Sequence, residues 1–377
     1  MLENVMLQRT DRFVGRTMNW LYDHLRFVPR CKLVVVSDSL ENRDEFPALE
    51  AHEMPHLAFQ ERLWRRLTGV DLRSRYRRVL RDLSPKLIHS HFGYVAVNDL
   101  ELVRFLKVPW VVSFYGADVY QLGKLAEWQA KYRVVFEVAT KILALGPEMA
   151  AALRQLGCPA EKIEVHALGV HVEALPKMPR VLRPGDSLKL LFAGTFREKK
   201  GLVYVLEAVS LARKAGIPVH LTVIGDAAGK PGDRETKAEL LEKRETLGLQ
   251  DHVSLYDYVA FKKLMEIALS CHVFVAPSVT ASEGDAEGTP FVLQQMMATA
   301  MPCISTVHSD IPFLFGKSDG LLVPERNSQA IADRLLSYVT RPEQLTEDGI
   351  KLRREILAAF DVKSCAQRLA QIYESIK

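Results

Sequence analysis

Long apolar runs are absent from this sequence. No stretch approaches the ~18 consecutive apolar residues that a membrane-spanning helix requires. The opening residues, MLENVMLQRTDRF, mix charges throughout and do not place an apolar stretch behind a basic one, so no secretory signal is expected. We therefore expect the chain to be cytoplasmic, touching a membrane at most from that side.

Cysteine is scarce as well. The five cysteines are odd in number and widely spaced, and none forms a CxxC or a Cys/His cluster. This pattern favours buried, reduced thiols over a disulfide framework or a metal site. We expect neither a metal nor a cofactor.

A strong charge of one sign is also lacking. The formal net charge of +4 divides into +5 for residues 1–180, from 26 basic and 21 acidic residues, and −1 for the remainder. Much of the basic excess lies in residues 61–78, with seven arginines and two acidic residues. A local basic surface of this kind does not indicate a nucleic-acid binder. Two interpretations of it stay open: helices that contact anionic lipid, or core-packed helices with a solvated charged face.

The sequence does contain a regular alternation of apolar runs and amphipathic helical patterns. Near-continuous apolar runs are typical of parallel strands buried on both faces, so the alternation predicts an α/β fold with doubly wound parallel sheets. The predicted strands are 32–37, 86–92, 110–116, 141–146, 188–194, 219–225, 253–258, 273–278 and 303–307.

The length of 377 residues predicts two domains. The alternation breaks at residues 175–187, LPKMPRVLRPGDS, where three prolines and a glycine predict a linker. We therefore expect one domain over 1–180, a second over 181–360 and a final helix over 361–377. Two doubly wound domains that face each other form a cleft, and ligands bind beyond the carboxyl ends of such strands.

The first candidate loop is FAGTFREKKG, residues 192–201, where a strand ends and a helix opens near Gly201. Backbone amides at a helix start, joined by Arg197, Lys199 and Lys200, favour a phosphate or a diphosphate. The alternative is a solvated basic turn between a strand and a helix.

The second candidate loop leads into EGTPFVLQQ. Thr289 is predicted to cap the helix, and Pro290 fits its first turn. Gly288 lets a ligand approach the backbone closely, and Glu287 can accept hydrogen bonds from neutral hydroxyl groups such as those of a sugar. The alternative is an ordinary turn in which Glu287 is only a capping acid.

Two further motifs end neighbouring strands in the first half, HSHFG and SFYGAD. Strand alternation places His89 and His91 on the same face. We expect His89 to be structural and His91 to line a cleft. Tyr115 and Asp118 are expected at the end of the neighbouring strand, where clefts form.

The order of these motifs, with Gly169-Val170 between the two halves, resembles family 4 of the retaining glycosyltransferases, which have the GT-B fold. The likeness extends from about residue 32 to the last helix. It implies two Rossmann-like domains, an acceptor-binding first half and a second half that binds a nucleotide sugar. It also implies transfer with retention of anomeric configuration, no catalytic metal, and a last helix that crosses back onto the first domain.

The resemblance also assigns roles to individual residues. Lys200 matches the diphosphate-binding lysine, and Glu287 matches the first acid of the Glu-x7-Glu signature, which contacts the donor sugar. Asp118 matches the aspartate of the His-Gly-x-Asp segment. Together with the loop residues above, the expected catalytic set is Glu287, Lys200, Arg197, Asp118, Tyr115 and His91. The expected donor-binding set is Thr195, Arg197, Lys200, Tyr258, Val259, Glu287, Gly288, Thr289, Pro290 and Gln295, with Tyr258 and Val259 at the nucleobase.

Three positions depart from the family pattern. Gln295 replaces the second glutamate, which usually binds both ribose hydroxyls, and an amide offers one acceptor oxygen and an NH2 donor instead. Thr195 stands where an arginine is common, and Arg197 supplies a charge two residues later. Tyr115 replaces the histidine of His-Gly-x-Asp.

The resemblance leads us to expect an active hexosyltransferase. Its donor is a nucleotide-diphosphate sugar, its acceptor is a saccharide or a lipid-linked saccharide, and its place is bacterial polysaccharide or glycolipid synthesis. Two alternatives stay open: a nucleotide-sugar-binding subunit that no longer transfers, and a GT-B epimerase of nucleotide sugars.

Overall fold

A computed structural model describes residues 5–15, 19–47, 49–54, 80, 83–229 and 232–376. The chain divides into two compact units, the first formed by Met1–Gly169 with Val362–Lys377, and the second by Val170–Asp361. The basic segment 61–78 lies outside the described residues. Within the described part, no helix is both long and apolar enough to cross a membrane.

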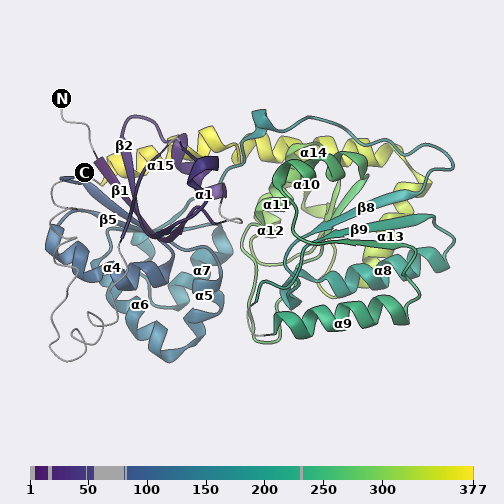
Figure 1. Cartoon of the computed structure of the whole chain (residues 1–377), viewed down its shortest axis with the longest axis horizontal. Coiled ribbons are helices and arrows are strands. Elements are labelled where there is room, and N and C mark those ends of the chain that lie inside the picture. The colour runs from purple at the N-terminus through teal and green to yellow at the C-terminus, as the bar shows by residue number, and fades with distance from the viewer. Residues whose placement is uncertain are drawn as a thin grey trace. The chain divides into compact units, whose positions relative to one another are not determined.

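The first unit is built on a sheet of parallel strands in the order β3-β2-β1-β4-β5-β6-β7 (Figure 1). This is the doubly wound arrangement that the alternating pattern predicts. The strands are β1 (Val5–Phe13), β2 (Lys32–Leu40), β3 (Glu50–Glu53), β4 (Leu87–His91), β5 (Trp110–Ser113), β6 (Lys141–Ala144) and β7 (Ile163–Val165).

Helices cover both faces of this sheet. Figure 1 shows α4 to α7 on one face and α1 with α15 on the other. Apolar side chains of the strands alternate between the two core layers, so that Leu7 packs with the first group and Met6 with the second. The helices are α1 (Asn19–Arg26), α4 (Gly93–Leu106), α5 (Ala117–Tyr120), α6 (Ala126–Val138), α7 (Pro147–Gln155) and α15 (Val362–Ser375).

The apolar-run pattern did not predict β1, although β1 lies inside the sheet. The middle of VMLQRTDRF is polar, yet Arg9 is buried. Its guanidinium pairs with Asp99 at 3.0 Å and Asp38 at 3.3 Å and donates to the carbonyl of Val36. These partners are distant in sequence. They compensate the buried charge of Arg9, so this segment can form an inner strand although its polar sequence is typical of a surface segment.

The second unit repeats the arrangement in a sheet ordered β10-β9-β8-β11-β12, again with parallel neighbours. Its strands are β8 (Leu188–Ala193), β9 (Val219–Ile224), β10 (Val253–Tyr256), β11 (Val273–Ala276) and β12 (Cys303–Ser305). Figure 1 shows α8, α9 and α13 on one face and α10, α11, α12 and α14 on the other. The helices are α8 (Leu202–Lys214), α9 (Asp233–Thr246), α10 (Phe261–Ser270), α11 (Phe291–Ala298), α12 (Ile311–Phe315), α13 (Ser328–Thr340) and α14 (Glu343–Ala359).

The proline-rich segment 175–187 does not divide the two units, although its composition predicts that it does. The first unit ends at Gly169, and this segment belongs to the second unit. Arg180 is buried there, and its guanidinium donates to the carbonyls of Cys271 at 2.8 Å and Ala268 at 3.2 Å. These hydrogen bonds fasten the segment to the end of α10.

The strand order reverses between β1 and β4 in the first unit and between β8 and β11 in the second. In open parallel sheets, ligands bind beyond the carboxyl ends of the strands at such a switch point. The loops that follow β8 and β11 are therefore the first place to look for a site in the second unit.

Candidate functional site

Two loops meet at the switch point of the second unit. The loop after β8 ends in a single 3-10 turn, Glu198–Lys200, and Gly201 follows with a φ of 67°. A Cβ atom at position 201 would overlap the carbonyl oxygen of Pro277, which follows β11. Glycine thus permits the close approach of the two loops.

A cluster of charged side chains joins these loops. Lys199 lies at its centre, with its Nζ 3.1 Å from Asp285 Oδ2 and 3.2 Å from Glu287 Oε1. Lys200 Nζ lies 2.9 Å from the other oxygen of Glu287, and Arg197 lies 3.1 Å from Asp285. The loop after β8 supplies the cations of this cluster, and the loop after β11 supplies the two carboxylates.

The carboxylate of Asp285 is more deeply buried than the lysines that face it. The Asp285 side chain is 0% exposed, Lys199 is 12% exposed and Lys200 is 20% exposed. Burial alone would raise the pKa of Glu287, but the charges of Lys199 and Lys200 outweigh it and hold that pKa well below its ordinary value. Burial likewise opposes the charge of Lys199, yet Glu287 and Asp285 raise its pKa. Glu287 and Lys199 thus each favour the charged form of the other.

The backbone of Glu287 is held by a second set of contacts. Its N–H donates to Nε2 of His308 at 3.0 Å, and Nδ1 of His308 lies 2.6 Å from Glu325 Oε1. The other oxygen of Glu325 accepts from the N–H of Thr280 at 2.9 Å. His308, in the segment after β12, therefore links the loop of Glu287 to the segment before α13.

The start of α11 differs from the prediction in one detail. Thr289 does not cap the helix, because Pro290 occupies the N-cap position and makes no side-chain cap, and α11 begins at Phe291. Gly288, Thr289 and Pro290 are all buried beside the cluster loop, and Gln295 is buried on α11. Proline suits this place because its missing N–H needs no partner there.

The remaining donor-site candidates lie on the loop after β8 and on the loop after β10. Thr195 follows β8, and its backbone carbonyl accepts a hydrogen bond from the backbone N–H of Arg197 at 3.0 Å. Tyr258 and Val259 follow β10, and the Tyr258 ring is 47% exposed. The Tyr258 hydroxyl donates to the Asp226 carbonyl at 2.9 Å, which ties this loop to the one after β9.

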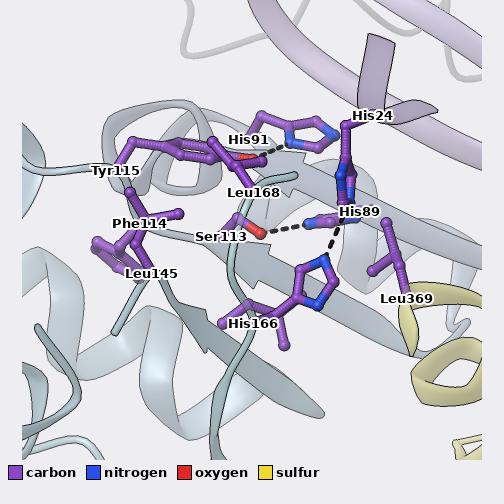
Figure 2. A pocket seen from close by; sticks show the side chains of 11 residues that line it. His24, His89, His91, Ser113, Phe114, Tyr115, Leu145, His166, Leu168 and Leu369 are labelled. Carbon is purple, nitrogen blue, oxygen red and sulfur yellow. Dashed lines mark hydrogen bonds between the residues drawn. The ribbon is translucent and has the colours of Figure 1, made fainter. Parts of the chain in front are cut away.

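The candidates of the first unit lie at the carboxyl ends of β4 and β5 (Figure 2). His91 is 1% exposed, so it does not line an open cleft as expected. Its Nε2 lies 3.0 Å from the amide oxygen of Gln8, and its Nδ1 lies 2.6 Å from the Tyr115 hydroxyl. Since the Gln8 oxygen accepts, Nε2 carries the proton and Nδ1 accepts from Tyr115.

His89 is structural, as its place on the strand predicts. Its two nitrogens contact the hydroxyls of Tyr373 at 2.7 Å and Ser113 at 2.8 Å. Tyr373 belongs to α15, so the last helix is bonded directly to the sheet of the first unit. Together with His24 and His166, which meet at 3.0 Å, these histidines surround a cavity of only about 10 Å³ (Figure 2).

Asp118 is satisfied entirely by the backbone of its own unit. It accepts from the N–H groups of Gly93 at 3.0 Å, Tyr115 at 3.0 Å and Gly116 at 2.8 Å. Burial raises the pKa of Asp118 despite these bonds, which favour the charged form. The carboxylate fastens the loop after β4 to the loop after β5, so it positions Tyr115 in this structure.

A larger pocket opens beyond the carboxyl ends of β1 and β2, beside the start of β3. Its volume is about 380 Å³, within the range of small-molecule sites. Glu41, Arg43 and Asp44 give it a mixed charge, and apolar side chains form the rest of its wall. Its lining consists of Phe13, Val14, Glu41, Arg43, Asp44, Phe46, Pro47, Leu49 and Ala51.

Sequence reasoning did not single out three residues of the second-unit site. Asp285 is the middle acid of Glu283, Asp285 and Glu287, and nothing in the pattern marks it as the buried one. His308 carries one usable signal, because it directly follows the carboxyl end of the predicted strand 303–307. The sequence gives no such signal for Glu325. Among the described residues, no group of three or more histidine, cysteine or acidic side chains is arranged to hold a metal ion.

Both family models and individual relatives match this chain. Residues 176–353 match the family described as Glycosyl transferases group 1, and residues 16–169 match the Glycosyl transferase 4-like domain. AmsK of Erwinia amylovora, an amylovoran biosynthesis glycosyltransferase, is 30% identical over 291 residues, which cover 76% of this chain and 69% of AmsK. WcaL of Salmonella typhimurium, named for colanic acid biosynthesis, is 30% identical over 292 residues, covering 76% of this chain and 70% of WcaL.

Solved structures share the fold at low identity. HepE of Anabaena, in complex with UDP, superposes with a TM-score of 0.79 at 15% identity, and the match covers 99% of this chain and 100% of HepE. Sucrose-phosphate synthase of Thermosynechococcus elongatus superposes with a TM-score of 0.78 at 15% identity, and the match covers 99% of this chain and 98% of the synthase. The fold and the two family matches agree with the motif order, and the chain belongs to the GT-B glycosyltransferases of family 4.

Proposed function

We propose that the chain transfers a hexose from a nucleotide-diphosphate sugar, with retention, to a saccharide or lipid-linked acceptor during bacterial polysaccharide assembly. The observation that carries this proposal is the cluster at the switch point, in which Arg197 pairs with Asp285 while Lys199 and Lys200 pair with Glu287. Cations there favour a diphosphate, and a carboxylate favours sugar hydroxyls. HepE, which shares the fold, binds UDP and UDP-glucose in its crystal structures, and this supports a nucleotide sugar as the donor.

The proposed reaction needs little acid–base chemistry from the protein. The bond between the sugar C1 and the diphosphate oxygen breaks, and the acceptor oxygen bonds to C1 on the same face. The acceptor proton passes to the departing phosphate oxygen. Lys200 and Arg197 stabilise the charge that develops on this leaving group, and Glu287 orients the sugar. Burial raises the pKa of Tyr115, and this agrees with a mechanism in which Tyr115 does not act as a base.

The donor base is addressed by a direct test. UDP-, GDP- and ADP-sugars are screened by thermal shift, since a ligand that binds only the folded protein raises its melting temperature. The nucleotide that binds then enters a hydrolysis and transfer assay, and NMR of the product reports its anomeric configuration. Binding without any turnover would instead support the non-transferring subunit, and inversion at C1 would refute retention.

Lys200→Ala tests the diphosphate site itself. We expect transfer to fall by about tenfold or more with the fold intact, because one charge-assisted contact to the leaving group is lost. The matched control is Lys263→Ala, which removes the same charge from an exposed lysine of α10 and should change little. Full activity in Lys200→Ala would show that the loop has another role.

We propose that the pocket beyond the carboxyl ends of β1 and β2 receives the acceptor. Its volume of about 380 Å³, its apolar wall and the carboxylates of Glu41 and Asp44 suit a hydroxyl-rich saccharide. Replacing both acids by alanine is expected to raise the KM for acceptor without changing donor hydrolysis. An unchanged KM for acceptor would place the acceptor elsewhere.

We further propose a cytoplasmic location with peripheral contact at the inner membrane face. The support is the basic sequence of 61–78, with seven arginines. Sedimentation with anionic vesicles at low and high salt tests it. Absence of salt-sensitive binding would refute membrane contact and leave the transfer reaction unaffected.

A further inference from the structure

We infer that His308 and Glu325 form a positioning pair that holds Glu287 in its working orientation through the backbone. The pair rests on the proposed function in one respect, namely that Glu287 orients the donor sugar. The geometry of the pair is a separate observation and stands whatever the donor is. Neither residue is among the catalytic or donor-binding residues that the sequence predicts.

Glu287 needs such support because regular structure does not provide it. The segment between Ala276 and Phe291 contains neither helix nor strand. The backbone of Glu287 is anchored by its N–H, which donates to Nε2 of His308 at 3.0 Å. A carboxylate aimed at a sugar must keep its place to a fraction of an ångström, and displacements near 1 Å cost roughly a hundredfold in rate.

The tautomer of His308 follows from its neighbours. The Glu287 backbone N–H is a donor under all conditions, so Nε2 of His308 must present a lone pair. The proton of the neutral ring is then on Nδ1, which lies 2.6 Å from Glu325 Oε1 and donates to it. Glu325 thus selects the tautomer in which His308 accepts from Glu287.

Glu325 itself is set by two donors. Its Oε1 accepts from His308, and its Oε2 accepts from the N–H of Thr280 at 2.9 Å. A carboxylate can serve both donors, but an amide cannot. With glutamine at 325, either the NH2 faces the Thr280 N–H, or it donates to Nδ1 and forces the proton of His308 onto Nε2, against Glu287.

This logic makes a sharp prediction for two substitutions. Glu325→Gln and His308→Ala are each expected to lower kcat/KM for the nucleotide sugar by about tenfold or more, because both release the Glu287 backbone. His308→Gln places an amide oxygen near the position of Nε2, so it should recover activity to within about threefold of the wild type. The matched control is His220→Ala, which removes a half-buried histidine of β9 that bonds to Ser254 and should change little.

Two readouts separate positioning from a general structural role. Affinity for the plain nucleotides UDP, GDP and ADP should stay within about threefold in all variants, since these lack the sugar that Glu287 contacts. In addition, 15N-labelled histidine spectra of the wild type should show the His308 proton on Nδ1.

Contrary results are equally clear. A His308 proton on Nε2 in the wild type would overturn the inference, as would His308→Gln losing as much activity as His308→Ala. Equal loss of plain nucleotide binding would show that the loop has collapsed rather than shifted. If no nucleotide binds the wild type, the proposed function fails, and the histidine spectra still decide the tautomer of the pair.

Discussion

Replacing Lys199 by methionine should destabilise the second unit far more than the same replacement at Lys200. Methionine keeps the length of the apolar stem and removes only the charge, so packing changes little. The two lysines are adjacent in sequence and contact the same carboxylate, Glu287. The comparison therefore isolates what burial and shared partners contribute.

The magnitudes follow from the partners left behind. Without Lys199, the fully buried Asp285 retains only Arg197 at 3.1 Å in the cluster, and breaking a buried ion pair typically costs about 3–5 kcal/mol. Without Lys200, Glu287 keeps Lys199 at 3.2 Å, so the expected loss is about 1 kcal/mol. In a unit of this size, 1 kcal/mol corresponds to roughly 2–4 °C in Tm.

Differential scanning calorimetry of the two variants measures this difference. Lys199→Met should lower the melting temperature of the second unit by about 6 °C or more, and Lys200→Met by about 4 °C or less. The functional order is the reverse, because Lys200 is the more exposed of the two: nucleotide-induced stabilisation should be weakened mainly in Lys200→Met.

Two results would refute this reasoning. One is a Lys199→Met protein with the melting temperature of the wild type, which would mean that the buried carboxylate of Asp285 pairs with another group or binds a proton. The other is an equal loss of melting temperature in both variants. Either would show that adjacency in sequence, rather than burial, decides the role of each lysine.

Three further predictions concern other parts of the molecule. Acidification should destabilise the first unit: burial lowers the pKa of His24 to about 4, and burial with the charge of His24 lowers that of His91 to about 3. Because an unfolded histidine titrates near 6.5, the unfolded chain binds protons first, and the free energy of unfolding falls as the pH drops below about 6.5, by about 2 kcal/mol at pH 5 for His24 alone. Urea unfolding at pH 7.5 and pH 5 measures this, and equal midpoints would contradict it. Asp118→Ala leaves three backbone N–H groups without their acceptor and should cost about 3 kcal/mol by the same measurement, with a midpoint near that of the wild type as the contrary result. Gln295→Glu should leave nucleotide affinity equal or better in calorimetric titration, because a carboxylate accepts from two hydroxyls, whereas a large loss would mean that the amide NH2 binds a different group.

Much of the fold was predictable because the responsible signals are local. The apolar runs of β8 and β11 predict parallel strands, and the loops after them contain the cations and Glu287. The strand β1 was not predictable in this way, since Arg9 interrupts its apolar pattern and is neutralised by Asp38 and Asp99. A pattern within nine residues carries no record of partners that lie elsewhere in the chain.

The candidate site shows the same division. Lys200 and Glu287 were expected from the motif order, and the structure joins them at 2.9 Å across 87 residues of sequence. His91 and Asp118 were expected at a cleft, but their polar atoms are engaged by Gln8, Tyr115 and backbone N–H groups within the first unit. Chemistry-bearing residues can be named from sequence, while the partners that occupy them cannot.

The sequence by itself determined the alternation of strands and helices, and hence two parallel sheets whose loops carry charge at their carboxyl ends. Tertiary structure alone decided that Lys199 pairs with both Asp285 and Glu287 while Lys200 pairs with Glu287. It also decided that His308 and Glu325 hold the backbone of Glu287. The physical reason is that backbone periodicity is set by near neighbours. Burial, ion pairing and tautomer choice depend on groups that meet only when the chain has folded.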